Sequence, residues 1–450
     1  MSLLLKNALI VTMNDGFEVV QGDVSVREGR IAAVGVVPDA PHDRVIDAEG
    51  DYVLPGLIQT HIHLCQTLFR GYADDMPLMQ WLRTRVWPME AAHTAASLRA
   101  AARLATTELL ASGTTAVLTM ETVHETDAVF EAVAESGIRA TIGKCMMDAD
   151  ADVPSRLKEH TRTSLDESVA LYRRWHNTSD GRIRAALAPR FAVSCTRELL
   201  EGVAALSTAH QALVHTHASE SRDEIAIVRQ ISGGLSNLAY LDSLKLATPH
   251  LCAAHCVWAD DAEQEMLARR DVKVMHCPSS NLKLGSGIAP VAEMRRRGIT
   301  VSLGADGAAC NNRLDMFDEM RLAAMLQAVH HHPGALSARD ALWMATRAGA
   351  ARLRWSTTSV RLKSARRPTS SGFGGASRTS RLIQTPTPLS CTRRVAPTSS
   401  PASSTARCLS TRVRRPASRG RRSRSRPGPP HGSWPFAPVY NPLAVSVEEC

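Results

Sequence analysis

Two alternating patterns of hydrophobic and polar positions run through most of this chain. Short apolar runs rich in β-branched residues have the length of buried strands, and the segments between them carry apolar residues at helical spacing. The expected strands are 54–63, 114–120, 138–145, 183–187, 212–217, 250–255, 272–276 and 299–305. The clearest expected helices are 97–112, 127–136, 197–208, 261–269 and 314–329. Eight strands that alternate with helices predict an α/β fold, a (β/α)8 barrel of the TIM type.

The first 55 residues follow a different pattern. Apolar and polar residues alternate there, and turn signals occur at 14–16 (Asn-Asp-Gly) and 28–29 (Glu-Gly). Alternation of period two between such turns predicts a small β domain made of hairpins. We therefore divide the chain into a β domain at 1–55, a barrel at 56–353 and an atypical tail at 354–450.

The tail differs from the rest in composition. Residues 354–450 contain 17 arginines and one lysine against two glutamates, so the net charge of +9 combines a basic tail with an acidic body. A segment rich in Arg, Ser and Pro is typical of a disordered, nucleic-acid-binding tail. An arginine run alone is a weak indicator of nucleic-acid binding, however.

A frameshift explains the tail better than a nucleic-acid partner does. Codons can be chosen for residues 363–371 so that translation two nucleotides later gives the strand-like peptide VGKKADIV, and residues 404–412 give DGEVLVDA at the same offset. We infer a frameshift near Arg352 to Trp355, with a disordered tail after it. Nucleotide sequence without an open frame at that offset would contradict this inference.

Cysteines and hydropathy suggest the compartment. The ten cysteines are scattered singly, without a Cys-x-x-Cys pair, which fits free thiols in a reducing cytoplasm. No apolar run has the length of a membrane span, and the N-terminal residues 2–10 have the pattern of a strand rather than of a signal peptide. We expect a cytoplasmic protein with no membrane partner.

Metal-binding side chains stand at several expected strand ends. His61 and His63 are two residues apart and so face the same side of the first barrel strand. His217 ends the fifth strand and Asp306 follows the eighth, while His215 lies one layer deeper and is expected to pack in the barrel. A single histidine among 17 is usually a core or surface residue. Three imidazoles and a carboxylate in this order, however, predict a site for Zn²⁺ or another borderline divalent ion.

Five sequence motifs carry a resemblance to a known family. They are PGLIQTHIH at 55–63, HASE at 217–220, AHC at 254–256, HCPSSNLKLGSG at 276–287 and GADGAACNN at 304–312. From about Leu3 to Ala351 the chain resembles the amidohydrolase superfamily, in its branch of cytosine, guanine and adenosine-type deaminases and triazine chlorohydrolases. Members pair the barrel with a β-sandwich built from both chain ends, so the tail implies that the C-terminal half of the sandwich is disrupted.

The resemblance also implies roles for the site residues. His61, His63, His217 and Asp306 would hold one metal ion per chain, zinc or alternatively Fe²⁺. The other implied catalytic residues, which act beside Asp306, are Glu220 and His255. A bound cation activates a water molecule, and Asp306 can accept the proton of that water. Glu220 can carry a proton to the ring nitrogen and to the leaving group. His255 can orient the water, stabilise the oxyanion or act as a further ligand in some states.

The resemblance leaves the substrate open. Gln66 and Arg190 are similar to residues that contact the base in guanine deaminases, although Gln66 could instead cap a loop and Arg190 could pair with a local acid. The run 306–317 is closer to adenosine-type and adenosylhomocysteine deaminases. We expect a homo-oligomeric, metal-dependent aminohydrolase that deaminates a small purine-like or related N-heterocycle. Hydrolytic dechlorination of chlorotriazines is the alternative, and nucleic-acid binding through the tail is a weaker one.

Overall fold

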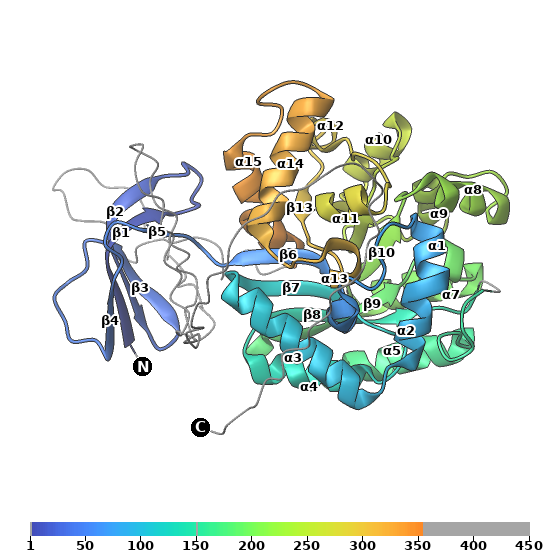
Figure 1. Ribbon diagram of the computed structural model, residues 1–450, viewed down its shortest axis with the longest axis horizontal. Coiled ribbons are helices and arrows are strands. Elements are labelled where there is room, and N and C mark those ends of the chain that lie inside the picture. Colours follow the sequence, from blue (N-terminus) through green and yellow to red (C-terminus); the bar gives the residue numbers. More distant parts are fainter. Residues whose placement is uncertain (1, 150–151, 354–450) are drawn as a thin grey trace, which may run out of the picture. The chain divides into compact units, whose positions relative to one another are not determined.

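Eight parallel strands form one continuous sheet in the computed structural model, which describes residues 2–149 and 152–353. The strands follow chain order from β6 to β13, and most of them are labelled in Figure 1. They are β6 (Leu57–Ile62), β7 (Thr114–Met120), β8 (Arg139–Met146), β9 (Ile183–Pro189), β10 (Val214–Ala218), β11 (Leu251–His255), β12 (Lys273–His276) and β13 (Val301–Leu303). All eight predicted strands are present, and the prediction of an α/β barrel is confirmed.

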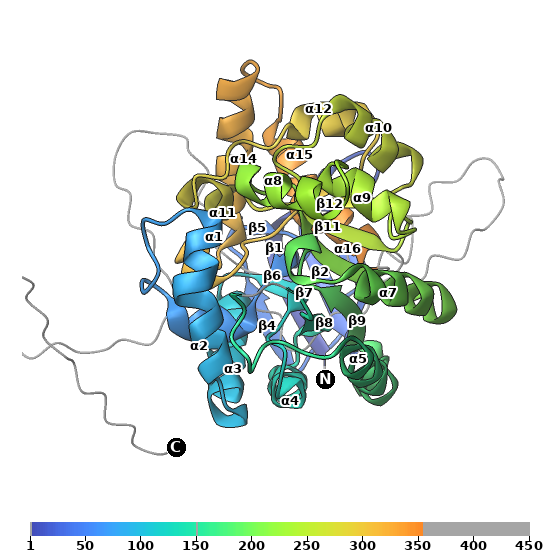
Figure 2. The ribbon, with the colours of Figure 1, turned by 90° about the vertical axis from the view of Figure 1, so that its right-hand side faces the viewer.

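Helices surround this ring of strands, as the view along the barrel in Figure 2 shows. The helices that match the sequence prediction are α3 (Ala95–Ala111), α4 (Thr126–Ser136), α7 (Arg197–His210), α10 (Asp261–Arg269) and α14 (Met316–His330). The others are α1 (Leu78–Trp81), α2 (Trp87–Ala92), α5 (Thr161–Trp175), α6 (Thr178–Gly181), α8 (Arg222–Ile231), α9 (Asn237–Ser243), α11 (Pro278–Lys283), α12 (Val291–Arg296), α13 (Ala308–Asn311), α15 (Ala338–Trp343) and α16 (Gly349–Arg352). The segment η1 (Leu64–Phe69) is a 3₁₀ helix, and η2 (Leu82–Val86) and η4 (Met344–Ala348) are π-helical turns.

Local sequence explains where several of these helices begin. At the start of α8, the Ser221 hydroxyl accepts the backbone N–H of Glu224, and the Glu224 carboxylate accepts the N–H of Ser221. Asp260 and Glu263 form the same reciprocal pair at α10. Such capping boxes satisfy backbone donors that have no partner inside the helix. They fix the helix starts directly after the loops that follow β10 and β11.

The barrel closes where β13 meets β6. The Thr60 hydroxyl donates to the carbonyl of Leu303 at 2.9 Å, and the backbone N–H of Asp306 donates to the carbonyl of His61 at 3.1 Å. Gly304 lies between these contacts, and a Cβ there would stand 2.5 Å from the carbonyl oxygen of His61. Only glycine therefore permits this close approach of the two strands.

Replacement of Gly304 by alanine should destabilise the closure. Because the clash is with backbone, β6 or β13 must shift, and we expect a loss of about 2 kcal/mol of unfolding free energy together with weaker metal retention. Gly16→Ala is the control, since a Cβ there would lie at an ordinary 3.4 Å from Glu18. Denaturant unfolding and metal analysis would measure both effects. Equal stability and metal content in the two variants would contradict this account of closure.

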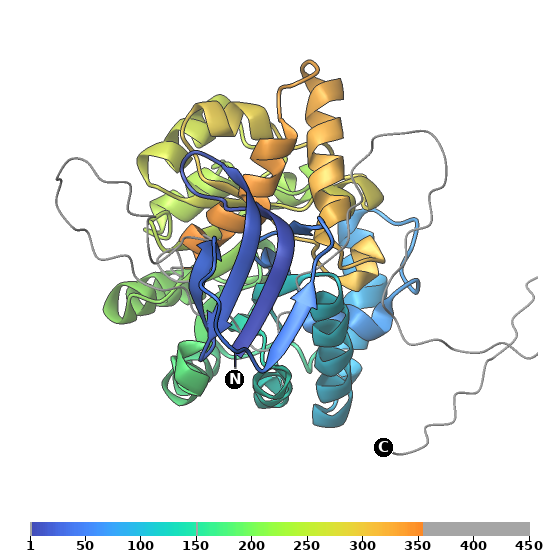
Figure 3. The ribbon, with the colours of Figure 1, turned by 90° about the vertical axis from the view of Figure 1, so that its left-hand side faces the viewer.

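A separate five-stranded sheet occupies the N-terminal residues (Figure 3). Its strands are β1 (Ser2–Val11), β2 (Val19–Arg27), β3 (Arg30–Gly35), β4 (Arg44–Asp47) and β5 (Tyr52–Val53). The two predicted turns join antiparallel pairs, β1 with β2 and β2 with β3. The prediction of hairpins is wrong for β4 and β5, which both pair with β1 in parallel. Strands that pair in parallel need a crossover connection and cannot be joined by a tight turn.

Some predictions concern residues that the structure does not describe, and others concern membrane spans and cysteines. The tail at 354–450, with the predicted frameshift and disorder, lies outside them. No helix within the described part of the chain is long and apolar enough to cross a membrane. Its seven cysteines are all free and buried.

Candidate metal centre and acid–base pair

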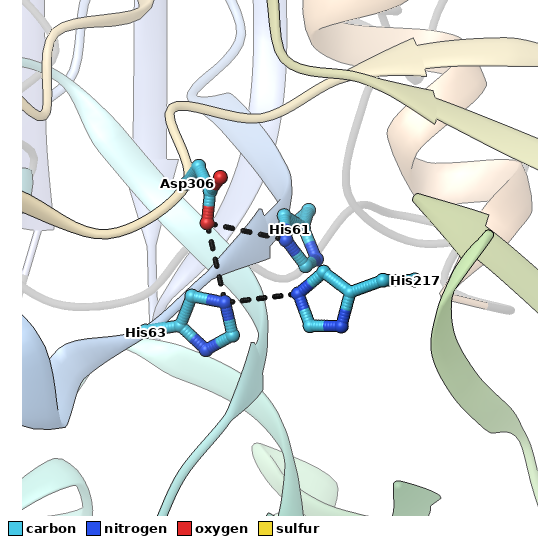
Figure 4. Close-up of side chains that lie close together, drawn as sticks. All are labelled: His61, His63, His217 and Asp306. Atoms are coloured by element: carbon cyan, nitrogen blue, oxygen red, sulfur yellow. Dashed lines mark hydrogen bonds and ion pairs between the residues drawn. The ribbon is translucent and has the colours of Figure 1, made fainter. Parts of the chain in front are cut away.

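Four side chains that the sequence analysis selected as ligands converge at the carboxyl ends of the barrel strands (Figure 4). His61 lies in β6 and His63 directly after it, His217 lies in β10, and Asp306 follows β13. One Asp306 oxygen, Oδ1, lies 3.3 Å from Nε2 of His61 and 3.2 Å from Nε2 of His63. Candidate ligand atoms of the four residues lie within 4.8 Å of one another, and all four residues are buried. The predicted ligand set is thus brought together.

The outer ring nitrogens of the three histidines have partners of their own. Nδ1 of His63 contacts the carbonyl of Met120 at 2.7 Å, and Nδ1 of His217 contacts the carbonyl of Arg190 at 2.7 Å. A carbonyl can only accept, so both Nδ1 atoms carry protons. In the neutral rings that metal binding requires, the Nε2 lone pairs face each other across 3.2 Å. Facing lone pairs need a cation between them, and the donor set therefore fits a divalent metal ion.

His215 has a more specific place than the packed core residue that we expected. It is fully buried in β10, and its Nε2 lies 2.6 Å from Nδ1 of His61. This contact orients the ring of His61 toward Asp306. His215 therefore supports a candidate ligand instead of filling space alone.

Burial and mutual charge set the protonation of the cluster. Burial lowers the pKa of His61 to about 4, against the opposing influence of Asp306. Burial alone would raise the pKa of Asp306, but the charges and hydrogen bonds of His61 and His63 hold it well below its usual range. An ionised carboxylate beside a neutral imidazole is the state that binds metal.

Backbone strain accompanies the site. Asp306 has φ +62° and His255, the last residue of β11, has φ +69°. Residues other than glycine rarely adopt this left-handed region, and each instance costs about 1–3 kcal/mol. Both strained residues point functional side chains into the site, so the strain is located where the chemistry would take place.

Glu220 and His255 form a buried pair beside the four ligands. Oε2 of Glu220 lies 3.5 Å from Nε2 of His255, and Nε2 of His255 lies 3.9 Å from Oδ2 of Asp306. Burial raises the pKa of Glu220 to about 7; the cationic form of His255 opposes the shift and Asp306 adds to it. A carboxyl group with such a pKa can both give and take a proton near neutrality.

A pocket of about 350 Å³, including its open part, lies over these residues. This volume is near the lower end for small-molecule sites. Its lining combines apolar side chains with the residues of the candidate site. Its lining residues are His63, Gln66, Leu78, Trp81, Leu82, Arg190, Phe191, His217, Glu220, His255, Leu284 and Asp306.

The two predicted substrate contacts both line this pocket, but they share a partner that the sequence analysis missed. Arg190 donates to both oxygens of Glu90, at 2.6 and 3.3 Å, and the Gln66 amide donates to Glu90 at 2.9 Å. The alternative that Arg190 pairs with a local acid therefore describes the structure. Gln66 Oε1 has no hydrogen-bond partner among the described residues, and a Cβ at Gly307 would overlap it.

Glu90 lacked a sequence signal because it lies in α2, far along the chain from Arg190. Two further contacts were missed although their residues lie in a motif that we had quoted. Asn281 contacts His255, and Ser286 contacts Glu220. The motif at 276–287 was used only as a mark of resemblance.

Comparison with known sequences agrees with this geometry. Residues 52–360 match the Amidohydrolase family. The chain belongs to that family. This amidohydrolase is 43% identical to 5'-deoxyadenosine deaminase from Methanothermobacter thermautotrophicus over 332 residues, which cover 73% of this chain and 76% of the relative. It is 41% identical to 5-methylthioadenosine/S-adenosylhomocysteine deaminase from Desulforudis audaxviator over 356 residues, which cover 78% and 80% of the two chains.

Solved structures with the same fold include two that contain zinc. An adenosine deaminase from Xanthomonas campestris with bound zinc is 33% identical, with a TM-score of 0.74 over 80% of this amidohydrolase and 82% of that chain. An atrazine chlorohydrolase from Arthrobacter aurescens complexed with zinc is 27% identical, with a TM-score of 0.74 over 80% and 84%. Both the deaminase and the dechlorinase expectations are thus represented among its relatives.

The raised pKa of Glu220 predicts a pH-dependent effect on stability. The folded pKa of about 7 exceeds the ordinary value of 4.5, so ionisation of Glu220 destabilises the fold as the pH rises between these values. In metal-free protein, Glu220→Gln should therefore gain stability over the wild type at about pH 8 and much less at about pH 5. The upper limit is about 3 kcal/mol at about 1.4 kcal/mol per pKa unit.

Thermal unfolding at the two pH values would measure this difference. Glu198→Gln is the control, because Glu198 is an exposed carboxylate in the first turn of α7. That substitution should change the melting temperature similarly at both pH values. An equal change for Glu220→Gln at both values would show that burial does not raise the pKa of Glu220.

Proposed function

We propose that this amidohydrolase is a zinc-dependent deaminase of adenosine-type nucleosides modified at the 5′ position. The single observation that carries the proposal is the buried pair of Glu220 and His255 at the pocket wall, beside the ligand cluster of His61, His63, His217 and Asp306. Support for the substrate class comes from the two curated relatives, named as deaminases of such nucleosides, at 41–43% identity. Zinc is supported by its presence in the two related structures.

The reaction replaces an exocyclic amine by oxygen. When bound, the divalent ion would lower the pKa of a water molecule enough for attack at an sp² carbon near neutral pH. Asp306 keeps Oδ1 toward His61 and His63 and has Oδ2 on the side of His255, so that Oδ2 is placed to take the proton of the water. A carbon–oxygen bond forms, the carbon–nitrogen bond breaks, and ammonia leaves.

Proton transfer falls to Glu220. Its carboxyl group, with a pKa of about 7, can protonate the ring nitrogen as water attacks. It then takes the proton that Asp306 accepted from the water and passes it to the departing amine, and the proton of the added hydroxyl group restores Glu220 as the carbon–oxygen double bond forms. His255 presents Nε2 between Glu220 and Asp306 and can orient the water or stabilise the oxygen that gains charge. In this arrangement His255 is a catalytic residue rather than a fifth ligand.

Gln66 and Arg190 are proposed to hold the base. The unpaired Oε1 of Gln66 is a buried acceptor that a substrate N–H can satisfy, which matters because a buried acceptor without a partner costs about 1–3 kcal/mol. Arg190 contributes donors that Glu90 does not take, and Glu90 balances its charge. The apolar wall of Leu78, Trp81 and Leu82 suits a nucleoside whose 5′ end is not hydroxylated.

Ammonia and chloride release from a substrate panel tests the proposal. The panel contains 5′-deoxyadenosine, adenosylhomocysteine, guanine, 8-oxoguanine, cytosine, pterins and chlorotriazines. We expect ammonia release with the highest kcat/KM for the two adenosine-type nucleosides. Chloride release from the triazines without deamination would establish the dechlorinase alternative, and guanine as the best substrate would contradict the proposed class.

Two variants should separate metal binding from proton transfer. His217→Ala removes a ligand, so we expect loss of retained zinc and of turnover. Glu220→Gln leaves the ligands in place, so it should keep one zinc per chain and lose about 10²–10⁴-fold in kcat. Metal analysis and steady-state kinetics measure both. Full activity in Glu220→Gln would refute the proton-transfer role.

A further inference from the structure

We propose that Asn281 and Ser286 are positioning residues that hold the Glu220–His255 pair in its productive geometry. Both belong to the segment 277–287, which comprises α11 and the loop after it. The inference rests on the proposed function, because it takes Glu220 and His255 as the catalytic pair. Neither residue is a metal ligand, and each acts through one member of the pair.

Asn281 fixes the ring of His255. Its Oδ1 lies 2.8 Å from Nδ1 of His255, and both side chains are buried. The amide oxygen can only accept, so Nδ1 carries the proton and the ring cannot flip without the loss of this bond. Nε2 is consequently left toward Glu220 at 3.5 Å and Asp306 at 3.9 Å.

Ser286 fixes the carboxylate of Glu220, the other member of the pair. Its hydroxyl donates to Oε1 of Glu220 at 3.3 Å, while Oε2 is the oxygen that faces His255. The two oxygens of Glu220 therefore have different tasks. One is tethered to the loop, and the other remains available for proton transfer. No other side chain in the described residues makes a hydrogen bond to the Glu220 carboxylate.

The backbone makes Asn281 and Ser286 a single unit. The carbonyl of Asn281 accepts the N–H groups of Ser286 at 2.8 Å and Gly287 at 3.4 Å. The carbonyl of Ser286 in turn accepts the indole N–H of Trp258 at 2.9 Å, and Trp258 is only three residues beyond His255. At Gly287, φ is +129° and a Cβ would crowd Trp258 at 3.0 Å, so glycine is required there.

The same segment is tied to the loop that carries Asp306. Lys283 donates to the carbonyl of Ala309 at 3.0 Å and to the Asn312 side chain at 2.9 Å. Ser279 donates its hydroxyl to Glu319 at 2.6 Å, and Glu319 also accepts from Asn311 at 2.8 Å. The segment 277–287 thus spans from the acid–base pair to the loop of Asp306, which limits the movement of one against the other.

Paired substitutions test this role. Asn281→Leu keeps the size but removes the acceptor, and Ser286→Ala removes the donor. Each should lower kcat on 5′-deoxyadenosine by about 10–100-fold, the usual loss when a group that orients an active-site residue is removed, with KM and zinc content nearly unchanged. Asn281→Asp and Ser286→Thr keep the acceptor and the hydroxyl, and they should restore most of kcat.

Ser279→Ala is the matched control for loosening of the segment. Its hydroxyl bonds to Glu319 and contacts neither Glu220 nor His255. The control should lower the melting temperature as the test variants do and leave kcat near the wild-type value. If Asn281→Leu and Ser286→Ala keep wild-type kcat, or lose no more than Ser279→Ala, the proposal is wrong.

A measurement that does not depend on enzyme turnover tests the role of Asn281 separately from the proposed function. Long-range proton–nitrogen spectra of histidine-labelled full-length protein, with His255→Ala to assign the signal, report which ring nitrogen carries the proton. We expect Nδ1 in the wild type and a changed signal in Asn281→Leu. An unprotonated Nδ1 in the wild type overturns the role of Asn281 whatever the substrate is, whereas an inactive wild type with the expected spectra overturns the proposed function alone.

Discussion

Closure of the barrel between its first and last strands is the constraint on which the site depends. His61 belongs to β6 and Asp306 follows β13, so these ligands are far apart in sequence and meet only when the ring is complete. The contact is made by the backbone bond from Asp306 to the carbonyl of His61, and the lack of a side chain at Gly304 permits it. A divalent ion held by residues of both strands would add a link at this junction, so metal binding and closure would stabilise each other.

Around this contact, neighbouring groups set the orientation and the protonation of the site residues. Carbonyls of Met120 and Arg190 set the tautomers of His63 and His217, and His215 orients His61. Around them lie the carboxylates, whose environments differ. Asp306, beside imidazoles, stays ionised, whereas burial brings the pKa of Glu220 near 7. Two carboxyl groups so close together can then serve as a ligand and as a proton carrier because their surroundings separate their pKa values.

Sequence patterns predicted the eight barrel strands and selected four side chains that the fold brings together, because both depend on local periodicity and on order along the chain. The parallel pairing of β4 and β5 with β1 could not be predicted, since it depends on contacts between segments that are distant in sequence. Glu90 was missed for the same reason: nothing near it in sequence marks it as the partner of Arg190. The frameshift remains a hypothesis about residues outside the described part of the chain, and the gene sequence alone decides it.

One contiguous stretch, from His63 through η1 to α2, supplies much of the pocket. His63, Gln66, Leu78, Trp81 and Leu82 are five of the twelve lining residues, and Glu90 lies just beyond them. Apart from His63, none of these belongs to the ligand set. Much of the pocket lining is therefore encoded apart from most of the candidate ligands. Evolution or a designer could exchange the first crossover of the barrel for that of a relative and change the accepted ring while the hydrolytic machinery stays in place.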